Sequence, residues 1–172
     1  MNHTAVAEAF QSTAKWSGPR LKTLPDFGGS PQAMLEHFTA HPELICDLDL
    51  ERRPGTYARN LLWSDAETSV WAMVWDRGAR TAIHDHHCAC AFGLISGNLT
   101  EIRFRAFDGI RVAKTWEAMH QPGDIASLAT THPNIHQMVN DSDRVAISLH
   151  IYGYDPRVHA SSVDREYLLA QA

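Results

Sequence analysis

The sequence is poor in cysteine, in net positive charge and in long apolar runs. Its three cysteines, Cys46, Cys88 and Cys90, form an odd and sparse set that does not fit a secreted disulfide framework. A formal net charge of −5 argues against a nucleic-acid partner. No segment reaches the length of a membrane span, and residues 1–16 lack the basic and apolar pattern of a signal peptide. We therefore expect a cytoplasmic protein with no membrane partner.

The length of 172 residues allows a single domain with its own core, without disulfides or a structural metal. Residues 1–50 have a helical pattern, in which Ser30 is a good N-cap and Pro31 a good first helical position. Residues 51–155 have a β pattern, and residues 156–172 are a C-terminal tail without a clear pattern. We expect one β-domain that carries a short N-terminal helical layer.

Short β-like runs separated by glycine, proline and asparagine turn signals fill the middle of the chain. The clearest runs are residues 69–76, 90–95, 98–104, 112–116 and 145–152. Many short strands with regular turns favour a sandwich or a barrel. The predicted fold class is therefore mainly β.

Histidine is abundant, with eleven residues, and two of them, His84 and His86, are separated by a single position. Side chains alternate between the faces of a strand, so both imidazoles point the same way. An isolated pair of this kind is more often structural than metal-binding. The wider spacing of Gly78, His84, His86, Cys90 and Gly97 resembles the first cupin motif, with Cys90 where many cupins have glutamate.

A second stretch, PGDIASLATTHPNIHQMVN, ends near His136 and resembles the second cupin motif, which supplies a third histidine. Two motif halves in the right order predict that residues 1–172 form a cupin double-stranded β-helix, a jelly-roll barrel. Three neutral imidazoles suit iron, zinc, copper or nickel. Because no carboxylate joins them, a divalent ion keeps its full charge, which favours an anionic ligand such as a thiolate.

Four segments together resemble the cysteine dioxygenase type I family, and the resemblance runs from about Tyr57 to Tyr154. The segments are YARN at 57–60, VWDRGARTAIHDH at 74–86, IHQMVN at 135–140 and SLHIY at 148–152. In that family cysteine binds iron through its thiolate and amine, and both atoms of O₂ end on sulfur. The resemblance implies the product cysteine sulfinate.

The resemblance also implies roles for single residues. His84, His86 and His136 would hold one Fe(II) per chain, and Arg59 would grip the substrate carboxylate with Tyr57 in support. A guanidinium suits this task because it can donate two parallel hydrogen bonds to a carboxylate. Arg59 taken alone also fits an ordinary surface ion pair.

Ser148, His150 and Tyr152 match the family's relay, and alternation places all three on one face of a strand. The resemblance makes them catalytic and turns the phenol of Tyr152 toward the substrate. A buried hydrogen-bonded pair of Ser148 and His150 without a catalytic part also fits the sequence.

Cys90 departs from the usual cupin motif. Some family members carry a thioether between a cysteine of this region and the relay tyrosine, and counting back from Gly97 assigns Cys90 to a crosslink with Tyr152. If one strand runs unbroken past His86, Cys88 and Cys90 share its ligand face. A packing role for Cys90, or a fourth metal bond in a closed zinc site, stays open.

The substrate prediction is L-cysteine, because related 3-mercaptopropionate enzymes carry glutamine where this chain has Arg59. The interval from His84 to Gly97 is one residue shorter than in mammalian-type members, which favours the mercaptopropionate group. Mercaptosuccinate or a specialised cysteine-derived thiol also fits. A different class is a metal-binding cupin without oxygenase activity, a sensor or an isomerase. The expected partners are thus a small thiol and O₂, and the sequence leaves the oligomeric state undetermined.

Overall fold

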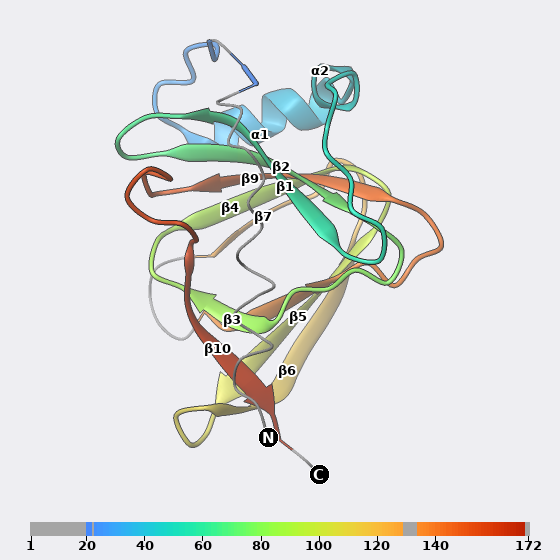
Figure 1. The fold of residues 1–172 in the computed structure, drawn as a ribbon, viewed down its shortest axis with the longest axis vertical. Coiled ribbons are helices and arrows are strands. Elements are labelled where there is room, and N and C mark those ends of the chain that lie inside the picture. Colours follow the sequence, from blue (N-terminus) through green and yellow to red (C-terminus); the bar gives the residue numbers. More distant parts are fainter. Residues whose placement is uncertain (1–19, 22, 129–133, 171–172) are drawn as a thin grey trace.

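Two β-sheets form the framework of the computed structural model, which describes residues 20–21, 23–128 and 134–170 (Figure 1). The strands of the first sheet, in spatial order, are β1 (Tyr57–Ser64), β2 (Ser69–Trp75), β9 (Ala146–Tyr152), β4 (Cys90–Ser96) and β7 (Ile125–Leu128). Those of the second are β10 (Val163–Leu169), β3 (Ile83–His86), β8 (His136–Val139), β5 (Leu99–Ala106) and β6 (Arg111–His120). Neighbouring strands pair antiparallel, except that a short parallel pairing of β10 with β6 closes the second sheet. The mainly β prediction is confirmed.

Two short helices, α1 (Pro31–Ala40) and α2 (Glu43–Cys46), lie beside the first sheet (Figure 1). The predicted cap is present, because the Ser30 hydroxyl accepts a hydrogen bond from the Ala33 amide at 3.2 Å. Gly93 of β4 allows close packing, since a Cβ built there would lie 2.9 Å from the Thr39 side chain of α1. The helical prediction for residues 1–19 lies outside the described residues.

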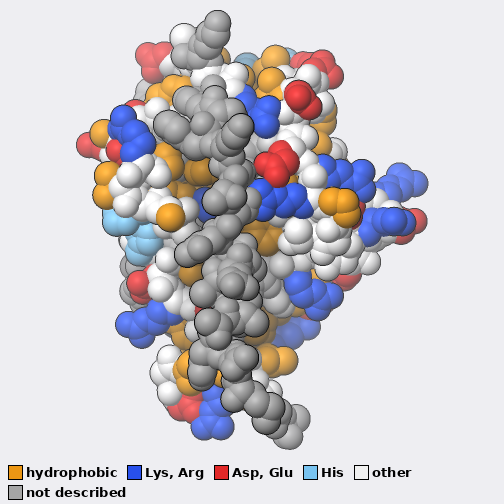
Figure 2. All heavy atoms as spheres, in the orientation of Figure 1, with side chains coloured by type: hydrophobic (Ala, Val, Ile, Leu, Met, Phe, Trp, Pro, Cys, Tyr) orange, Lys and Arg blue, Asp and Glu red, His pale blue; other side chains and the backbone are white. Residues whose placement is uncertain are grey.

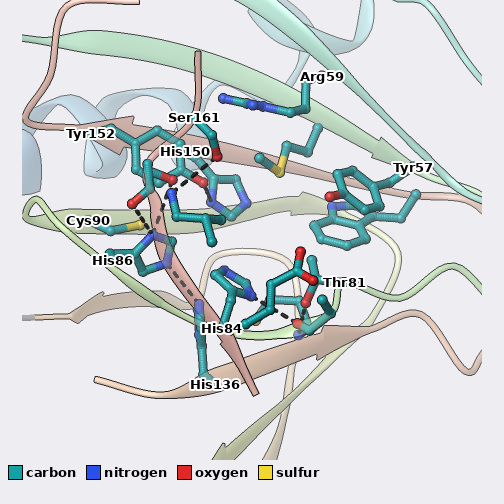
Figure 3. Close-up of a pocket in the computed structure, with 17 residues that line it drawn as sticks. Tyr57, Arg59, Thr81, His84, His86, Cys90, His136, His150, Tyr152 and Ser161 are labelled. Atoms are coloured by element: carbon teal, nitrogen blue, oxygen red, sulfur yellow. Dashed lines mark hydrogen bonds between the residues drawn. The ribbon is translucent and has the colours of Figure 1, made fainter. Parts of the chain in front are cut away.

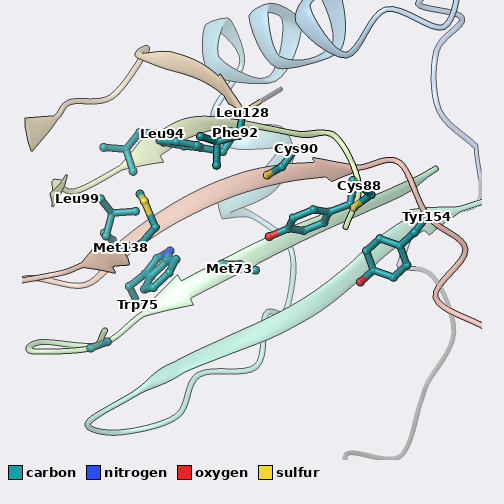
Figure 4. Close-up of a cluster of buried hydrophobic side chains, with 13 residues drawn as sticks. Met73, Trp75, Cys88, Cys90, Phe92, Leu94, Leu99, Leu128, Met138 and Tyr154 are labelled. Carbon is teal, nitrogen blue, oxygen red and sulfur yellow. The ribbon is translucent and has the colours of Figure 1, made fainter. Parts of the chain in front are cut away.

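Separate buried clusters stabilise the two sides of the first sheet. The inner cluster, between the sheets, includes Trp75, Phe92, Leu94, Leu99 and Met138 (Figure 4). The outer cluster joins the helices to the sheet; its members include Met34, Leu35, Phe38, Leu62, Val70, Ile95 and Leu149. Complete burial of side chains of this size contributes roughly 2 kcal/mol each to folding. The inner cluster fixes how far apart the two sheets stand.

An unbroken strand from His84 to Cys90, which was the condition for placing Cys88 and Cys90 on the ligand face, is not present. β3 ends at His86 in the second sheet, and β4 starts at Cys90 in the first. The backbone hydrogen bonds of the connecting residues run to loops: His87 N donates to Ser162 O at 3.1 Å, and Ala89 O accepts from Gly153 N at 3.0 Å. Alternation along one strand therefore cannot place the cysteines on the ligand face.

The C-terminal residues contain β10, a regular strand that the sequence pattern did not reveal. Asp85, the residue between the two histidines of β3, holds this strand in place. Its carboxylate accepts hydrogen bonds from the Arg165 amide at 2.8 Å and the Tyr167 hydroxyl at 2.7 Å. Because Asp85 faces away from His84 and His86, one short strand both presents ligands and fixes β10.

Basic, acidic and apolar side chains are interspersed over the described part of one face (Figure 2). In the described part of the chain, no helix is both long enough and apolar enough to span a membrane. The predictions of partners and of a single domain over the whole chain stay predictions.

Candidate metal centre

Three buried histidines converge between β3 and β8. Among the described residues, His84, His86 and His136 form a group whose possible ligand atoms all lie within 4.8 Å of one another. His84 pairs with His136 across the two strands, and His86 Nε2 lies 3.0 Å from His136 Nε2. Alternation on β3 turns His84 and His86 to the same side, as predicted. The cluster can hold a metal ion.

Each imidazole has an acceptor for its Nδ1 proton. The Nδ1 of His84 lies 2.9 Å from Ala82 O, that of His86 lies 3.1 Å from the Ser162 hydroxyl, and that of His136 lies 3.2 Å from a Glu101 oxygen. A proton held on Nδ1 leaves the Nε2 lone pair free for a metal. The donor set therefore fits a three-histidine metal site, with Nε2 as the ligand atom of each ring.

Glu101 of β5 contacts the Nδ1 of His136 and was not predicted from the sequence. Its carboxylate is completely buried and, besides His136, contacts His120 Nε2 at 3.3 Å and Arg103 Nε at 3.1 Å. Burial would raise the pKa of Glu101, but the hydrogen bonds from His120 and His136 outweigh it and hold the pKa well below its usual range. The ionised carboxylate orients His136 and strengthens it as a ligand. The only sequence signal for Glu101 was the presence of a single acidic residue within a β-like run.

Replacing Glu101 with glutamine should weaken metal affinity about 10- to 100-fold, because the amide loses the charge that polarises His136. Titration of the purified protein with Fe(II) or Co(II) measures this. The control is Glu117→Gln on neighbouring β6, where the side chain is exposed and ion-paired with Lys114. Equal affinity in both variants and the wild type would show that Glu101 does not support the ligand.

The metal-free protein should lose stability as the pH falls below 6.5. Burial, together with the smaller effect of the neighbouring histidines, lowers the pKa of His84 to about 3 and that of His86 to about 2. Unfolded histidine titrates near pH 6.5, so between these values protons bind the unfolded chain first. Above pH 6.5 these two histidines cost the folded protein no stability. By pH 5 each of them lowers the free energy of unfolding by about 2 kcal/mol.

Thermal unfolding of the metal-free protein at pH 7.5 and pH 5 measures this loss. The control is His41→Asn, which removes an exposed histidine outside the buried cluster, so the loss of stability that His84 and His86 cause should persist in this variant. An unfolding temperature that is the same at both pH values would contradict the prediction.

A hydrogen-bonded row of side chains lies on β9 across the pocket from the histidines. Trp75 Nε1 donates to the Ser148 hydroxyl at 2.8 Å, Ser148 Oγ lies 2.8 Å from His150 Nε2, and His150 Nδ1 lies 3.2 Å from the Tyr152 hydroxyl. Burial lowers the pKa of His150 to about 3 and raises that of Tyr152 above its usual value. The structure thus brings the predicted row together as neutral groups and adds Trp75 to it. Their catalytic role stays a prediction.

Arg59 of β1 lines the same pocket. Its guanidinium lies over the Trp71 ring at 4.4 Å and donates to the Tyr154 hydroxyl at 2.8 Å and to Ala160 O at 3.4 Å. The Nε–H is buried and has no hydrogen-bond partner within the described part of the chain. An unpaired buried donor is costly, so a ligand oxygen there would be well bound. The tyrosine that contacts Arg59 is therefore Tyr154, which sequence reasoning missed.

Tyr57, predicted to support Arg59, also lines the pocket, but its ring stacks on Trp75 with centroids 4.9 Å apart. Cys90 and Tyr152 are direct partners on adjacent strands β4 and β9, and both side chains are buried. Burial raises the pKa of the Cys90 thiol, and the ligand group above does not include this residue. Packing beside Tyr152 is what the structure shows for Cys90; the crosslink stays a prediction.

The pocket that joins these groups is small and lies between the sheets (Figure 3). The histidines occupy one end and Arg59 the other. The cavity volume is about 40 Å³, whereas a single water molecule needs about 10–15 Å³. A small molecule with an anionic group and a metal-binding group fits this arrangement.

Comparison with known proteins identifies related sequences and folds. A family model described as cysteine dioxygenase type I matches residues 43–164. A cupin superfamily protein from Desulfitobacterium hafniense DCB-2 is 15% identical with a TM-score of 0.50, covering 79% of this chain and 99% of that one. A protein from Thermus thermophilus is 16% identical with a TM-score of 0.50, covering 61% and 90%. These matches confirm the cupin fold.

A sugar phosphate isomerase from Silicibacter pomeroyi DSS-3 is 23% identical, with a TM-score of 0.48 over 58% of this chain. The chain spans 60% of the length of that protein.

Proposed function

Because this chain belongs to the cysteine dioxygenase type I family, we propose that it is a non-haem iron thiol dioxygenase acting on a small carboxylate thiol, with L-cysteine as the first candidate. The observation that carries the proposal is the pairing of three buried histidines with a guanidinium in one small pocket. The reaction would be RSH + O₂ → RSO₂H, which consumes no further reductant. We place it in the cytoplasm.

The three histidines support a metal of this kind. An Fe(II) ion held by His84, His86 and His136 would supply the redox chemistry that lets O₂ react with a thiol. Since all three ligands are neutral, the site attracts a thiolate more strongly than a site with a carboxylate ligand would. The hydrogen bonds on each Nδ1 keep the rings oriented before any ligand arrives.

Arg59 would orient the substrate. Its unpaired Nε–H can donate to a carboxylate oxygen while stacking on Trp71 and the bond to Tyr154 hold the guanidinium in position. A carboxylate fixed at this end turns the thiol of a short molecule toward the histidines. Such positioning can lower a barrier by several kcal/mol.

Tyr152 would act as a hydrogen-bond donor to the reacting groups. Its phenol stays protonated at neutral pH because burial raises its pKa. If Ser148 donates to His150 Nε2, the imidazole donates from Nδ1 to the phenol oxygen, so the phenol proton is not used in the bond to His150. Tyr152 can then donate that proton to another group beside it.

Arg59 favours L-cysteine as the substrate, because the related 3-mercaptopropionate enzymes carry glutamine at this position. The shortened interval between His84 and Gly97 favours 3-mercaptopropionate. Mercaptosuccinate also carries a carboxylate for the guanidinium. A metal-binding cupin without oxygenase activity would need neither Arg59 nor the row on β9.

The deciding experiment is oxygen uptake by anaerobically purified protein loaded with Fe(II). The substrates are L-cysteine, 3-mercaptopropionate, mercaptosuccinate and cysteamine, and product masses are recorded for each. A gain of two oxygen atoms on one thiol supports the proposal and identifies the substrate class. No uptake with any of the four thiols contradicts it.

A further inference from the structure

Glu166 of β10 brings a carboxylate to the wall of the pocket, and it lies beyond the residues that the family model matches. Its backbone pairs with that of His84, so the side chain enters from the sheet that carries the metal ligands. Asp85 accepts hydrogen bonds from the Arg165 amide and the Tyr167 hydroxyl, the residues on either side, and these bonds fix this part of β10. The position of Glu166 is therefore set by β3, the strand that presents His84 and His86.

The carboxylate of Glu166 has no ion-pair partner among the described residues. The adjacent cation, Arg165, lies 3.8 Å from Asp164 instead. Among the described residues that line the pocket, Arg59 is the only other one of the Lys, Arg, Asp and Glu types. Both act on one phenol: burial raises the pKa of Tyr57, the guanidinium of Arg59 lowers it and the carboxylate of Glu166 raises it.

The pocket wall thus has a positively charged part at Arg59 and a negatively charged part at Glu166. Arg59 comes from the first sheet and attracts an anion, whereas Glu166 comes from the second sheet and repels one. A thiol with one carboxylate can place it at Arg59 and leave the rest of the molecule near Glu166. A thiol with two carboxylates that places one at Arg59 brings the second toward the part of the wall that Glu166 lines, where it meets a like charge.

We propose that Glu166 is a specificity-determining residue that selects monocarboxylate thiols, amino-bearing ones above all, and rejects dicarboxylate thiols. The inference rests on the proposed function, since it names the substrate class of the same pocket. An ammonium or amine near Glu166 gains attraction or a hydrogen bond, while a second carboxylate gains only repulsion. The residue acts on binding and needs no part in the oxidation step.

The test compares binding in the absence of O₂, so that it does not depend on turnover. Affinities of Fe(II)-loaded protein for L-cysteine, 3-mercaptopropionate and mercaptosuccinate are measured by calorimetry under argon, for the wild type and Glu166→Gln. We expect the preference for L-cysteine over mercaptosuccinate to fall about tenfold in the variant. The change should shrink at high salt, because Glu166 is exposed and its charge is screened.

The matched control is Asp164→Asn, which removes the same charge from the same strand at a residue that does not line the pocket. It should leave the preference unchanged. A preference that stays the same in Glu166→Gln overturns the inference, even if the protein consumes O₂. A tenfold change without any O₂ uptake supports the inference while the dioxygenase proposal fails. If none of the thiols binds, both fail.

Discussion

Replacing His86 with alanine is expected to abolish metal binding and oxygen uptake, whereas replacing the adjacent His87 should preserve both. His86 is buried, and its Nε2 lies 3.0 Å from that of His136, at the point where a metal would be held. Removing a direct ligand should weaken metal affinity by more than the 10- to 100-fold that outer partners contribute. Metal content after dialysis and oxygen uptake with L-cysteine measure the two effects.

His87 is a close control because it is the same residue type at the next position. Its side chain is exposed, with Nε2 2.9 Å from Ser161 O and its ring 4.9 Å from that of His159. A variant His86→Ala that retains full metal content would show that the buried cluster is not the site. Equal loss in both variants would indicate a general disturbance of β3.

Replacing Arg59 with alanine should raise the KM for L-cysteine about 100-fold with a smaller change in kcat. Two charge-assisted hydrogen bonds to a carboxylate contribute roughly 3 kcal/mol together, and each 1.4 kcal/mol corresponds to a tenfold change. Cysteamine, which has no carboxylate, should bind equally well to both proteins. Arg59→Lys should not restore the affinity, because an ammonium cannot form the parallel pair of bonds.

The control for charge is Arg105→Ala, at an exposed position on β5 away from the pocket. Steady-state kinetics and anaerobic binding of both thiols separate the outcomes. If cysteamine and L-cysteine lose affinity equally in Arg59→Ala, the arginine supports the fold, through Trp71 and Tyr154, and does not recognise the carboxylate.

The ligand cluster could be predicted from the sequence because it depends on local rules. Alternation along a strand needs only the spacing of His84 and His86, and the second motif supplies His136 in a fixed order. Ser148, His150 and Tyr152 follow the same rule on one strand. These residues are brought together by strand geometry that a few neighbouring positions specify.

The supporting groups could not be predicted because they depend on pairing between distant segments. Glu101 reaches His136 through the pairing of β5 with β8, and Tyr154 reaches Arg59 across 95 positions of sequence. Glu166 belongs to a strand whose place depends on a side-chain contact with Asp85, in a segment without a strong β pattern. The break between His86 and Cys90 likewise arises because β3 and β4 join different sheets. The alternation of side chains along a strand does not predict which sheet the strand joins.

The pocket is divided between the sheets in a regular way. His84, His86, His136 and their support Glu101 all belong to the second sheet, whereas Arg59, Cys90 and the row ending in Tyr152 belong to the first. The spacing of the three histidines is thus internal to one sheet, but the gap from them to the phenol is set by the packing between the sheets. Substitutions in the first sheet, at Arg59 for example, can therefore change which molecule is accepted without moving the histidines, so related proteins can exchange substrates while they keep the same histidine cluster.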